Sequence, residues 1–265
     1  MSERAPAPAA PGLDGRSEAA LAAYDEKARR GWEREDPRDQ PTYMGSKMRC
    51  DYALVERVGI EGRNVLNVGC SFPVDELHYA RKVASWTAVD LSAESLRTAE
   101  AALRRELHPE LAAKFSFREA DACRLPFADG SFDLAVSMST FDHLPTAEAR
   151  QKAVDEMARV VRRGGHVVVT VASWWNLPYA AGIWKMSREK TLHYGYAYLF
   201  SPLELRRIVR RSGLVPLHFA SSIAPPRVWL PGYPAVVRYP AALAFGLLRV
   251  AGLFGRRIGF ACRKP

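Results

Sequence analysis

Short runs rich in β-branched residues alternate with helical runs between Asn64 and Ala172, and this alternation constrains the fold more than any other feature of the chain. Several runs carry no charge over at least five residues, as strands buried on both faces of a parallel sheet do. We expect Ser92 to cap one intervening helix, and Gly164 and Gly165 to close another that runs to residue 163. Alternating strands and helices predict right-handed crossovers and a doubly wound, parallel α/β sheet. The expected strands are 64–69, 85–90, 115–120, 132–137 and 166–172.

The flanks of this alternating core define the expected domain organisation. A length of 265 residues suits one domain with appendages better than two domains. Residues 1–16 are rich in Pro and Ala and lack the apolar stretch of a signal peptide, so we expect a disordered leader and a cytoplasmic protein. We expect residues 17–265 to form a single domain that opens with two helices in 17–60, one capped by Ser17 and one over 47–58.

The four cysteines are scattered along the chain without a CxxC pair. This spacing argues against a zinc site and against the disulfide framework of a small secreted protein. We therefore expect reduced thiols and no metal. The cysteines are Cys50, Cys70, Cys123 and Cys262.

The positive charge of the chain is concentrated near its end. The net charge is +9, and residues 204–265 hold 11 Lys and Arg against one acidic residue. Such a segment is compatible with nucleic acid, an anionic membrane surface or an anionic substrate, and equally with a solvated face that only aids solubility.

A glycine and an acid lie where a doubly wound sheet binds ligands, beyond the carboxyl ends of its strands. Gly69 follows the first strand, and Asp90 ends the second strand 21 residues later. A carboxylate at this spacing can accept hydrogen bonds from both hydroxyls of a ribose. The spacing alone suits NAD as well as S-adenosylmethionine, but the GxGxxG pattern of dehydrogenases is missing.

Four motifs follow one another along this region. They read VLNVGCSFP at 65–73, AVDLS at 88–92, DACRLPFADGSFDLAVS at 121–137 and EMARVVRRGG at 156–165. In this order and spacing they resemble the class I S-adenosylmethionine-dependent methyltransferases of the small-molecule type (methyltransferase type 11), over about residues 45–220. The resemblance implies a seven-stranded, mostly parallel sheet with an antiparallel last strand at 258–263, and methyl transfer from S-adenosylmethionine that leaves S-adenosylhomocysteine.

The resemblance also implies roles for single residues. Asp90 would bind the ribose, Leu91 would pack against adenine, Asp121 and Ala122 would meet the adenine edge, and the loop after the first strand would approach the methionine part of the cofactor. Each position also has a structural interpretation: Gly69 would serve the turn, and Ser137 would only end its strand. The implied cofactor-binding residues are Asn67, Gly69, Cys70, Ser71, Asp90, Leu91, Asp121, Ala122 and Ser137.

The first loop departs from the family pattern at three positions. Asn67 replaces the usual acid and lacks its negative charge, while Ser71 and Pro73 replace loop glycines. Proline fixes φ and removes an N–H, and serine resists a positive φ. Weak cofactor binding, or a non-catalytic binding protein with a methyltransferase fold, therefore stays an alternative to the enzyme.

Two regions are expected to serve the acceptor. Asp142 and His143 follow the fourth strand, and we expect them to contact substrate or act as general base, since a His near neutral pKa suits proton removal; the alternative is that His143 only packs under its loop. The long insertion at 173–201 is dense in aromatic residues, which suits a pocket for an apolar or aromatic acceptor or, alternatively, an ordinary hydrophobic cap. Its expected substrate residues are Trp174, Trp175, Tyr179, Trp184, His193, Tyr194 and Tyr196.

The segment 221–257 is apolar and basic, and we expect it to be an insertion before the last strand. Arginines and a proline interrupt its apolar run, which argues against a membrane-spanning helix. It would lie over the acceptor pocket as a lid or on an anionic membrane, and the second possibility makes a lipid or lipid-linked glycan acceptor the alternative to a small molecule. A nucleic-acid acceptor is disfavoured because no RNA-binding module is evident. The arginines considered for membrane contact are Arg227, Arg238, Arg249, Arg256 and Arg257.

Overall fold

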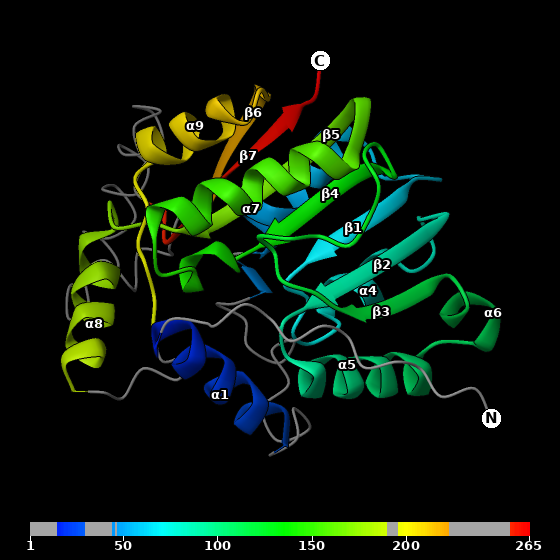
Figure 1. Cartoon of the computed structure of the whole chain (residues 1–265), viewed down its shortest axis with the longest axis horizontal. Coiled ribbons are helices and arrows are strands. Elements are labelled where there is room, and N and C mark those ends of the chain that lie inside the picture. The colour runs from blue at the N-terminus through cyan, green and yellow to red at the C-terminus, as the bar shows by residue number, and fades with distance from the viewer. Residues whose placement is uncertain (1–14, 30–43, 46, 190–195, 223–254) are drawn as a thin grey trace, which may run out of the picture.

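A seven-stranded sheet lies at the centre of the computed structural model, which describes residues 15–29, 44–45, 47–189, 196–222 and 255–265 (Figure 1). The strand order is β3-β2-β1-β4-β5-β7-β6. The first five strands pair in parallel, and β7 is antiparallel to both neighbours, β5 and β6. The predicted doubly wound sheet with an antiparallel last strand is therefore confirmed. The strands are β1 Asn64–Val68, β2 Ser85–Asp90, β3 Phe115–Glu119, β4 Phe132–Met138, β5 Val161–Ala172, β6 Val215–Ser222 and β7 Arg257–Arg263.

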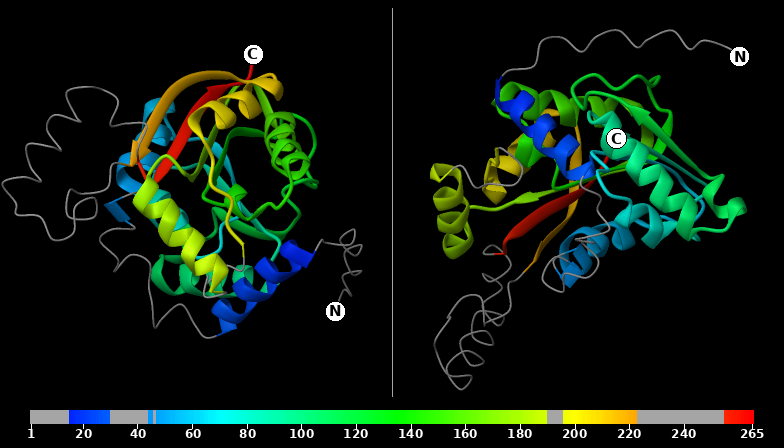
Figure 2. Two further views of the ribbon diagram at one scale, coloured as in Figure 1. Left: turned by 90° about the vertical axis from the view of Figure 1, so that its left-hand side faces the viewer. Right: turned by 90° about the horizontal axis from the view of Figure 1, so that it is seen from below.

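Helices cover both faces of the sheet. One face carries α7 and α9, and the other carries η3, α3, α4 and α5; Figure 2 shows β6 and β7 between α9 and the η3–α3 segment. A further helix, α1, packs against α5 on the side of the sheet where the parallel strands end (Figure 1). The helices are α1 Gly15–Arg29, the π-helix η3 Lys47–Tyr52, α3 Ala53–Val58, α4 Val74–Tyr79, α5 Ala93–Glu106, α6 Pro109–Ala112, the 3-10 turn η4 Phe141–His143, α7 Ala147–Val160, α8 Leu177–Arg188 and α9 Pro202–Arg211.

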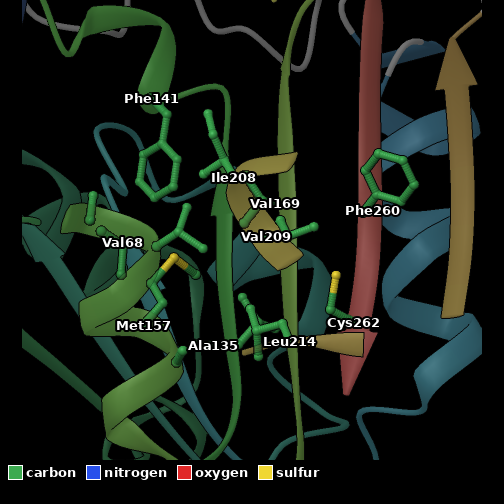
Figure 3. Close-up of a cluster of buried hydrophobic side chains, with 14 of the residues drawn as sticks. Val68, Ala135, Phe141, Met157, Val169, Ile208, Val209, Leu214, Phe260 and Cys262 are labelled. Carbon is green, nitrogen blue, oxygen red and sulfur yellow. The ribbon is translucent and has the colours of Figure 1, made fainter. Parts of the chain in front are cut away.

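Apolar side chains from the strands and from α7 and α9 form one of the two large cores. Val169 and Phe260 project from β5 and β7 toward Met157 of α7 and Val209 of α9 (Figure 3). All four side chains are buried. This packing explains why the strand sequences are charge-poor: both of their faces are covered.

Of the two serine caps that were predicted, the cap at Ser92 is confirmed, whereas Ser17 lies inside α1, which spans Gly15–Arg29; a further cap, at Thr146, was not predicted. Ser92 Oγ accepts a hydrogen bond from Ser95 N at 2.9 Å, and Thr146 Oγ1 accepts one from Ala149 N at 3.0 Å. Each hydroxyl satisfies one of the backbone donors left free in the first turn of its helix, α5 and α7.

The end of α7 differs from the prediction. The helix stops at Val160 instead of residue 163, and Gly164 and Gly165 lie inside β5. The β4–β5 register shifts between Phe132 and Leu134, and Gly164 takes a φ of 75° there. A Cβ on Gly165 would lie 2.6 Å from the Val161 side chain and 2.8 Å from the Asp133 carbonyl oxygen. The two glycines therefore permit an irregularity in the strand rather than cap the helix.

Most residues of two expected appendages lie outside the described residues. The leader at 1–16 and the insertion at 221–257 are described only at their inner ends, where α1 begins at Gly15, β6 ends at Ser222 and β7 begins at Arg257. The expected second helix, 47–58, consists of a π-helical turn followed by α3. Within the described ranges, no helix has both the length and the apolar character needed to cross a membrane.

Candidate active site

A cavity of about 430 Å³ opens at the carboxyl ends of β1, β2 and β4. Leu21 and Tyr24 of α1 line it from one side, and Tyr179 and Ile183 of α8 line it from another. This is the edge at which doubly wound sheets bind their ligands, and the volume lies in the range of small-molecule sites.

The loop after β1 is held tightly against the loop after β4. Gly69 has a φ of 80°, and a Cβ there would lie 2.2 Å from the Thr140 side chain. The Thr140 hydroxyl in turn donates to the Val68 carbonyl oxygen at 3.1 Å. Only glycine fits at position 69, because both the backbone angle and the close approach exclude a side chain.

Two serines that line the cavity are the only non-glycine residues with positive φ in the described part of the chain. Ser71 has a φ of 50° and Ser139 a φ of 62°. Such conformations are unfavourable for residues with a side chain, and they concentrate at functional sites. Ser71 Oγ is buried and has no hydrogen-bond partner among the described residues, so a polar ligand group would satisfy it.

Asp90 lies at the end of β2 and lines the same cavity. Its two carboxylate oxygens accept hydrogen bonds from Ser71 N and Ser92 N, each at 3.0 Å. Burial raises the pKa of this carboxyl group. Its position at the strand end is the one in which an acid meets a ribose in this class of sheet.

The predicted adenine-side residues also line the cavity. Leu91, Asp121 and Ala122 lie on its wall, together with Cys70 from the first loop. Asp121 Oδ1 accepts a hydrogen bond from Cys123 N at 2.8 Å, which fixes the turn after β3. A strand-end carboxylate, a buried hydroxyl without a partner among the described residues and an apolar wall together fit a nucleoside linked to an amino acid.

Two predicted cofactor residues lie behind the cavity wall. Asn67 Nδ2 donates to Glu76 Oε1 at 2.8 Å, and Trp86 Nε1 donates to the same oxygen at 2.9 Å. Burial raises the pKa of Glu76 to about 7. Ser137 Oγ donates to the Val68 carbonyl oxygen at 3.1 Å and so ties β4 to β1. Neither Asn67 nor Ser137 is among the residues that line the cavity.

His143 lies in η4, at the cavity wall beside α1. Its Nδ1 is 2.8 Å from the Tyr196 carbonyl oxygen, and its Nε2 is 3.0 Å from the Tyr24 hydroxyl. Desolvation by burial lowers the pKa of the imidazole, so the neutral form is favoured. Because a carbonyl oxygen only accepts, Nδ1 carries the proton and the lone pair of Nε2 accepts from Tyr24.

Asp142 is buried beside His143 and also lines the cavity. Both of its carboxylate oxygens accept from Ala172 N, at 3.0 and 3.1 Å. Burial raises the pKa of this carboxyl group to about 7. The Asp142 side chain therefore joins η4 to the end of β5.

A buried charge cluster contributes Lys47, Asp75 and Arg257 to the wall. Lys47 Nζ lies 2.5 Å from Asp75 Oδ1 and 3.7 Å from Asp51 Oδ2, and Arg257 pairs with Asp51. The Lys47 side chain is 2% exposed and that of Arg257 is 12% exposed. We call Lys47, Asp51, Asp75 and Arg257 the buried charge cluster. Its two cations and two carboxylates offset one another, as buried charges must.

Arg256 and Arg257, two of the arginines considered for membrane contact, lie in different surroundings. Arg257 belongs to the buried charge cluster, and the Arg256 guanidinium stands over the Tyr179 ring with 4.5 Å between its Cζ and the ring centroid. Both residues line the cavity. A membrane-facing role does not fit Arg257, which is mostly buried in an ion pair, whereas for Arg256 that role stays a prediction. The other three, Arg227, Arg238 and Arg249, lie outside the described residues.

Among the described aromatic side chains of the 173–201 insertion, Tyr179 is the one that lines the cavity. Trp174 and Trp184 are 45% and 74% exposed. Trp175 is half-buried away from the cavity, and Tyr196 contributes the carbonyl oxygen that binds His143. His193 and Tyr194 lie outside the described residues.

Many residues of the wall were absent from the predicted site, and those with titratable side chains are Tyr24, Lys47, Asp75, Arg256 and Arg257. Tyr24 had a sequence signal, since it belongs to the apolar stripe of α1, but nothing local indicates that its hydroxyl reaches a residue 119 positions away. Asp51 and Arg257 are 206 positions apart. Contacts between residues so far apart in the sequence depend on the order of the strands in the sheet. A single local motif does not predict that order.

The comparisons with known proteins agree with this fold. Residues 66–169 match a family model described as "Methyltransferase domain". A ubiquinone biosynthesis O-methyltransferase of Alkalilimnicola ehrlichii is 30% identical over 152 residues, which are 56% of this chain and 57% of that protein. The chain spans about half the length of the first curated relatives that it matches.

Two solved structures have the same fold. An S-adenosylmethionine-dependent methyltransferase of Methanosarcina mazei has a TM-score of 0.59 at 20% identity, covering 80% of this chain and 97% of that one. Geranyl diphosphate C-methyltransferase of Streptomyces coelicolor, solved with S-adenosyl-L-homocysteine, has a TM-score of 0.58 at 16% identity, covering 81% and 78%. Residues 66–169 of this chain therefore match a methyltransferase domain, and the whole sheet has the fold of the solved S-adenosylmethionine-dependent methyltransferases.

Proposed function

We propose that this chain transfers a methyl group from S-adenosylmethionine to a hydroxyl oxygen of a small acceptor held in the cavity. The observation that carries the proposal is a neutral imidazole, His143, on the wall of the cavity that Asp90 also lines. A hydroxyl acceptor must lose its proton when it is methylated, and a neutral imidazole is a suitable base. The relative from Alkalilimnicola, named an O-methyltransferase, supports oxygen as the acceptor atom.

The cofactor would lie along the strand ends. Asp90 would accept hydrogen bonds from the ribose hydroxyls, and Leu91, Asp121 and Ala122 would surround the adenine. The backbone at Gly69 would approach the methionine part, with Ser71 Oγ donating to or accepting from its polar end. When bound there, S-adenosylmethionine would supply an activated methyl group. The protein would then mainly have to hold the acceptor in line and exclude water.

His143 would receive the acceptor proton through Tyr24. The Tyr24 hydroxyl donates to Nε2, so a proton passed from the acceptor to the Tyr24 oxygen would be matched by transfer of the tyrosine proton to His143. The Nδ1–H bond to the Tyr196 carbonyl oxygen would stabilise the resulting imidazolium. Asp142 would position η4, because its carboxylate accepts a bifurcated hydrogen bond from Ala172 N at the end of β5.

Incubation with methyl-labelled S-adenosylmethionine and small-molecule extracts tests this proposal. We expect label in a methyl ether of an extracted compound, identified by mass spectrometry. A His143→Ala variant, which keeps Asp90 and the first loop, is the control and should yield far less product. Binding of S-adenosylhomocysteine without labelled product in any extract would instead favour a binding protein with this fold.

A further inference from the structure

We propose that the acceptor carries an oxyanion, a carboxylate or a phosphate, and that Arg256 binds this group at the wall between α8 and β7. The inference rests on the proposed methyl transfer and names the chemical class of its acceptor. It is carried by the position of the Arg256 guanidinium and by the charges around it.

The backbone of Arg256 is fixed on both sides. Its N–H donates to the Ser222 carbonyl oxygen at 3.0 Å, and its carbonyl oxygen accepts from Ser173 N at 2.9 Å. Ser222 ends β6 and Ser173 follows β5, so both partners belong to the ends of sheet strands. The side chain of Arg256 therefore starts from a rigid point on the rim of the cavity.

The guanidinium of Arg256 stands over Tyr179 and has no carboxylate partner among the described residues. An aromatic ring can support a guanidinium from one face, and this contact does not use the N–H donors, which lie in the plane of the guanidinium. Those donors match two oxygens of a carboxylate or a phosphate. Tyr179 thus orients a bidentate anion binder.

The carboxylates of the buried charge cluster already pair with other cations and do not neutralise Arg256. The buried charge cluster is balanced within itself, with Lys47 on Asp75 and Arg257 on Asp51. Burial raises the pKa of Asp142 to about 7, and the other two acids of the cavity, Asp90 and Asp121, follow β2 and β3 at the proposed cofactor end. Between α8 and β7, an arriving oxyanion would therefore meet a cation that has no carboxylate partner among the described residues.

The positive charge of Arg256 affects which acceptors can bind in the cavity. A wholly apolar acceptor that filled the cavity would displace water from Arg256 and leave its charge unpaired, which is costly. An acceptor with an oxyanion would replace that water with charge-assisted hydrogen bonds. The same cavity therefore disfavours neutral acceptors and selects anionic ones.

Paired probes that differ only in charge test the inference. Calorimetry would compare benzoate with its neutral analogue benzamide, and phenyl phosphate with phenol, on the protein saturated with S-adenosylhomocysteine. We expect at least one anion to bind about tenfold or more tightly than its neutral analogue, because hydrogen bonds to charged groups contribute at this level. Preference for benzoate would identify a carboxylate acceptor, and preference for phenyl phosphate a phosphate acceptor.

Three variants locate the effect. Arg256→Gln should abolish the preference for the anion, and Arg256→Lys should restore part of it by charge without the bidentate geometry. Arg206→Gln, on the exposed face of α9, removes a positive charge away from the cavity and should leave the preference unchanged.

The outcomes separate this inference from the proposed function. If each anion binds the parent protein no better than its neutral analogue, or if Arg256→Gln keeps the preference, the oxyanion site is overturned and methyl transfer is untouched. If the parent protein fails to bind S-adenosylhomocysteine, the proposed function fails, whereas the anion preference, measured again without it, still decides the inference about Arg256.

Discussion

At the scale of single residues, His143 combines two properties that a general base needs. Its Nδ1–H is held by the Tyr196 carbonyl oxygen, which fixes the tautomer, and burial lowers its pKa. A base whose pKa is lowered stays deprotonated to lower pH than free histidine does. The imidazole therefore offers its Nε2 lone pair across the whole neutral range.

We predict that His143→Ala lowers kcat by about 10²-fold or more while the affinity for S-adenosylhomocysteine stays unchanged. Tyr24→Phe should also lower kcat, because it removes the hydroxyl that donates to Nε2.

In the parent enzyme, activity should fall only as the pH drops below about 6.5, since protonation of a histidine with a lowered pKa requires more acid. A pH–rate profile measures this; loss of activity already above that pH would contradict the assignment.

Asp90 is the second residue whose role is open to direct measurement. Replacing it with Ala removes the carboxylate that would bind the ribose, and we expect the affinity for S-adenosylhomocysteine to fall by about 1.5–3 kcal/mol. Calorimetry on the parent and on the variant provides the comparison. Glu100→Ala, an acid-to-alanine change at an ion pair on α5, is the control and should bind as the parent does. Equal affinity in Asp90→Ala would remove Asp90 from the cofactor site.

At the scale of elements, local patterns predicted what local physics determines. The strand 85–90 was predicted with its observed bounds, and Ser92 was correctly expected to cap α5. The prediction failed where an element depends on its neighbours: α7 ends at Val160 because the chain already pairs with β4 at Val161. A helical pattern does not reveal that competition with a distant strand.

The two capped helices give a matched test of how α1 is attached. Ser92 Oγ accepts from Ser95 N and also donates to Asp25 Oδ1 of α1 at 2.5 Å, whereas Thr146 Oγ1 caps α7 alone. Loss of either cap should cost about 1 kcal/mol of unfolding free energy, measured by chemical denaturation. Ser92→Ala should in addition expose α1 to limited proteolysis, which Thr146→Ala should not. Equal protease sensitivity in the two variants would show that the Asp25 contact does not hold α1.

At the scale of the whole molecule, the cavity gathers residues that the sequence keeps far apart. The strand-end acid, the first loop and His143 were predicted from motifs, because each belongs to a contiguous stretch between β1 and η4. The buried charge cluster was not, because its members come from η3, α4 and β7, and only the order of the sheet brings them together. Local sequence patterns do not predict ion pairs between residues that are far apart in the chain.

The buried carboxyl groups with raised pKa values make the stability of the whole protein depend on pH. Glu76 is ionised more easily in the unfolded chain, where its pKa is near 4.5, than in the folded protein, where burial raises it to about 7. The folded state therefore binds the proton more tightly. This contribution to stability is fully present below the unfolded pKa and is lost as the pH rises through the folded pKa.

We therefore predict that Glu76→Gln stabilises the protein at pH 8 relative to the parent and has a smaller effect at pH 5. Glutamine keeps an oxygen that can accept from Asn67 Nδ2 and Trp86 Nε1, but it carries no charge to bury. A shift of this size corresponds to a free-energy difference on the order of 3 kcal/mol between the two pH values.

Chemical denaturation of both proteins at pH 5 and pH 8 measures the difference. Asp129→Asn, an exposed carboxylate on the surface, is the control and should show no comparable pH dependence. If Glu76→Gln is less stable than the parent at pH 8, the ionised carboxylate supports the fold, and the raised pKa of Glu76 is contradicted.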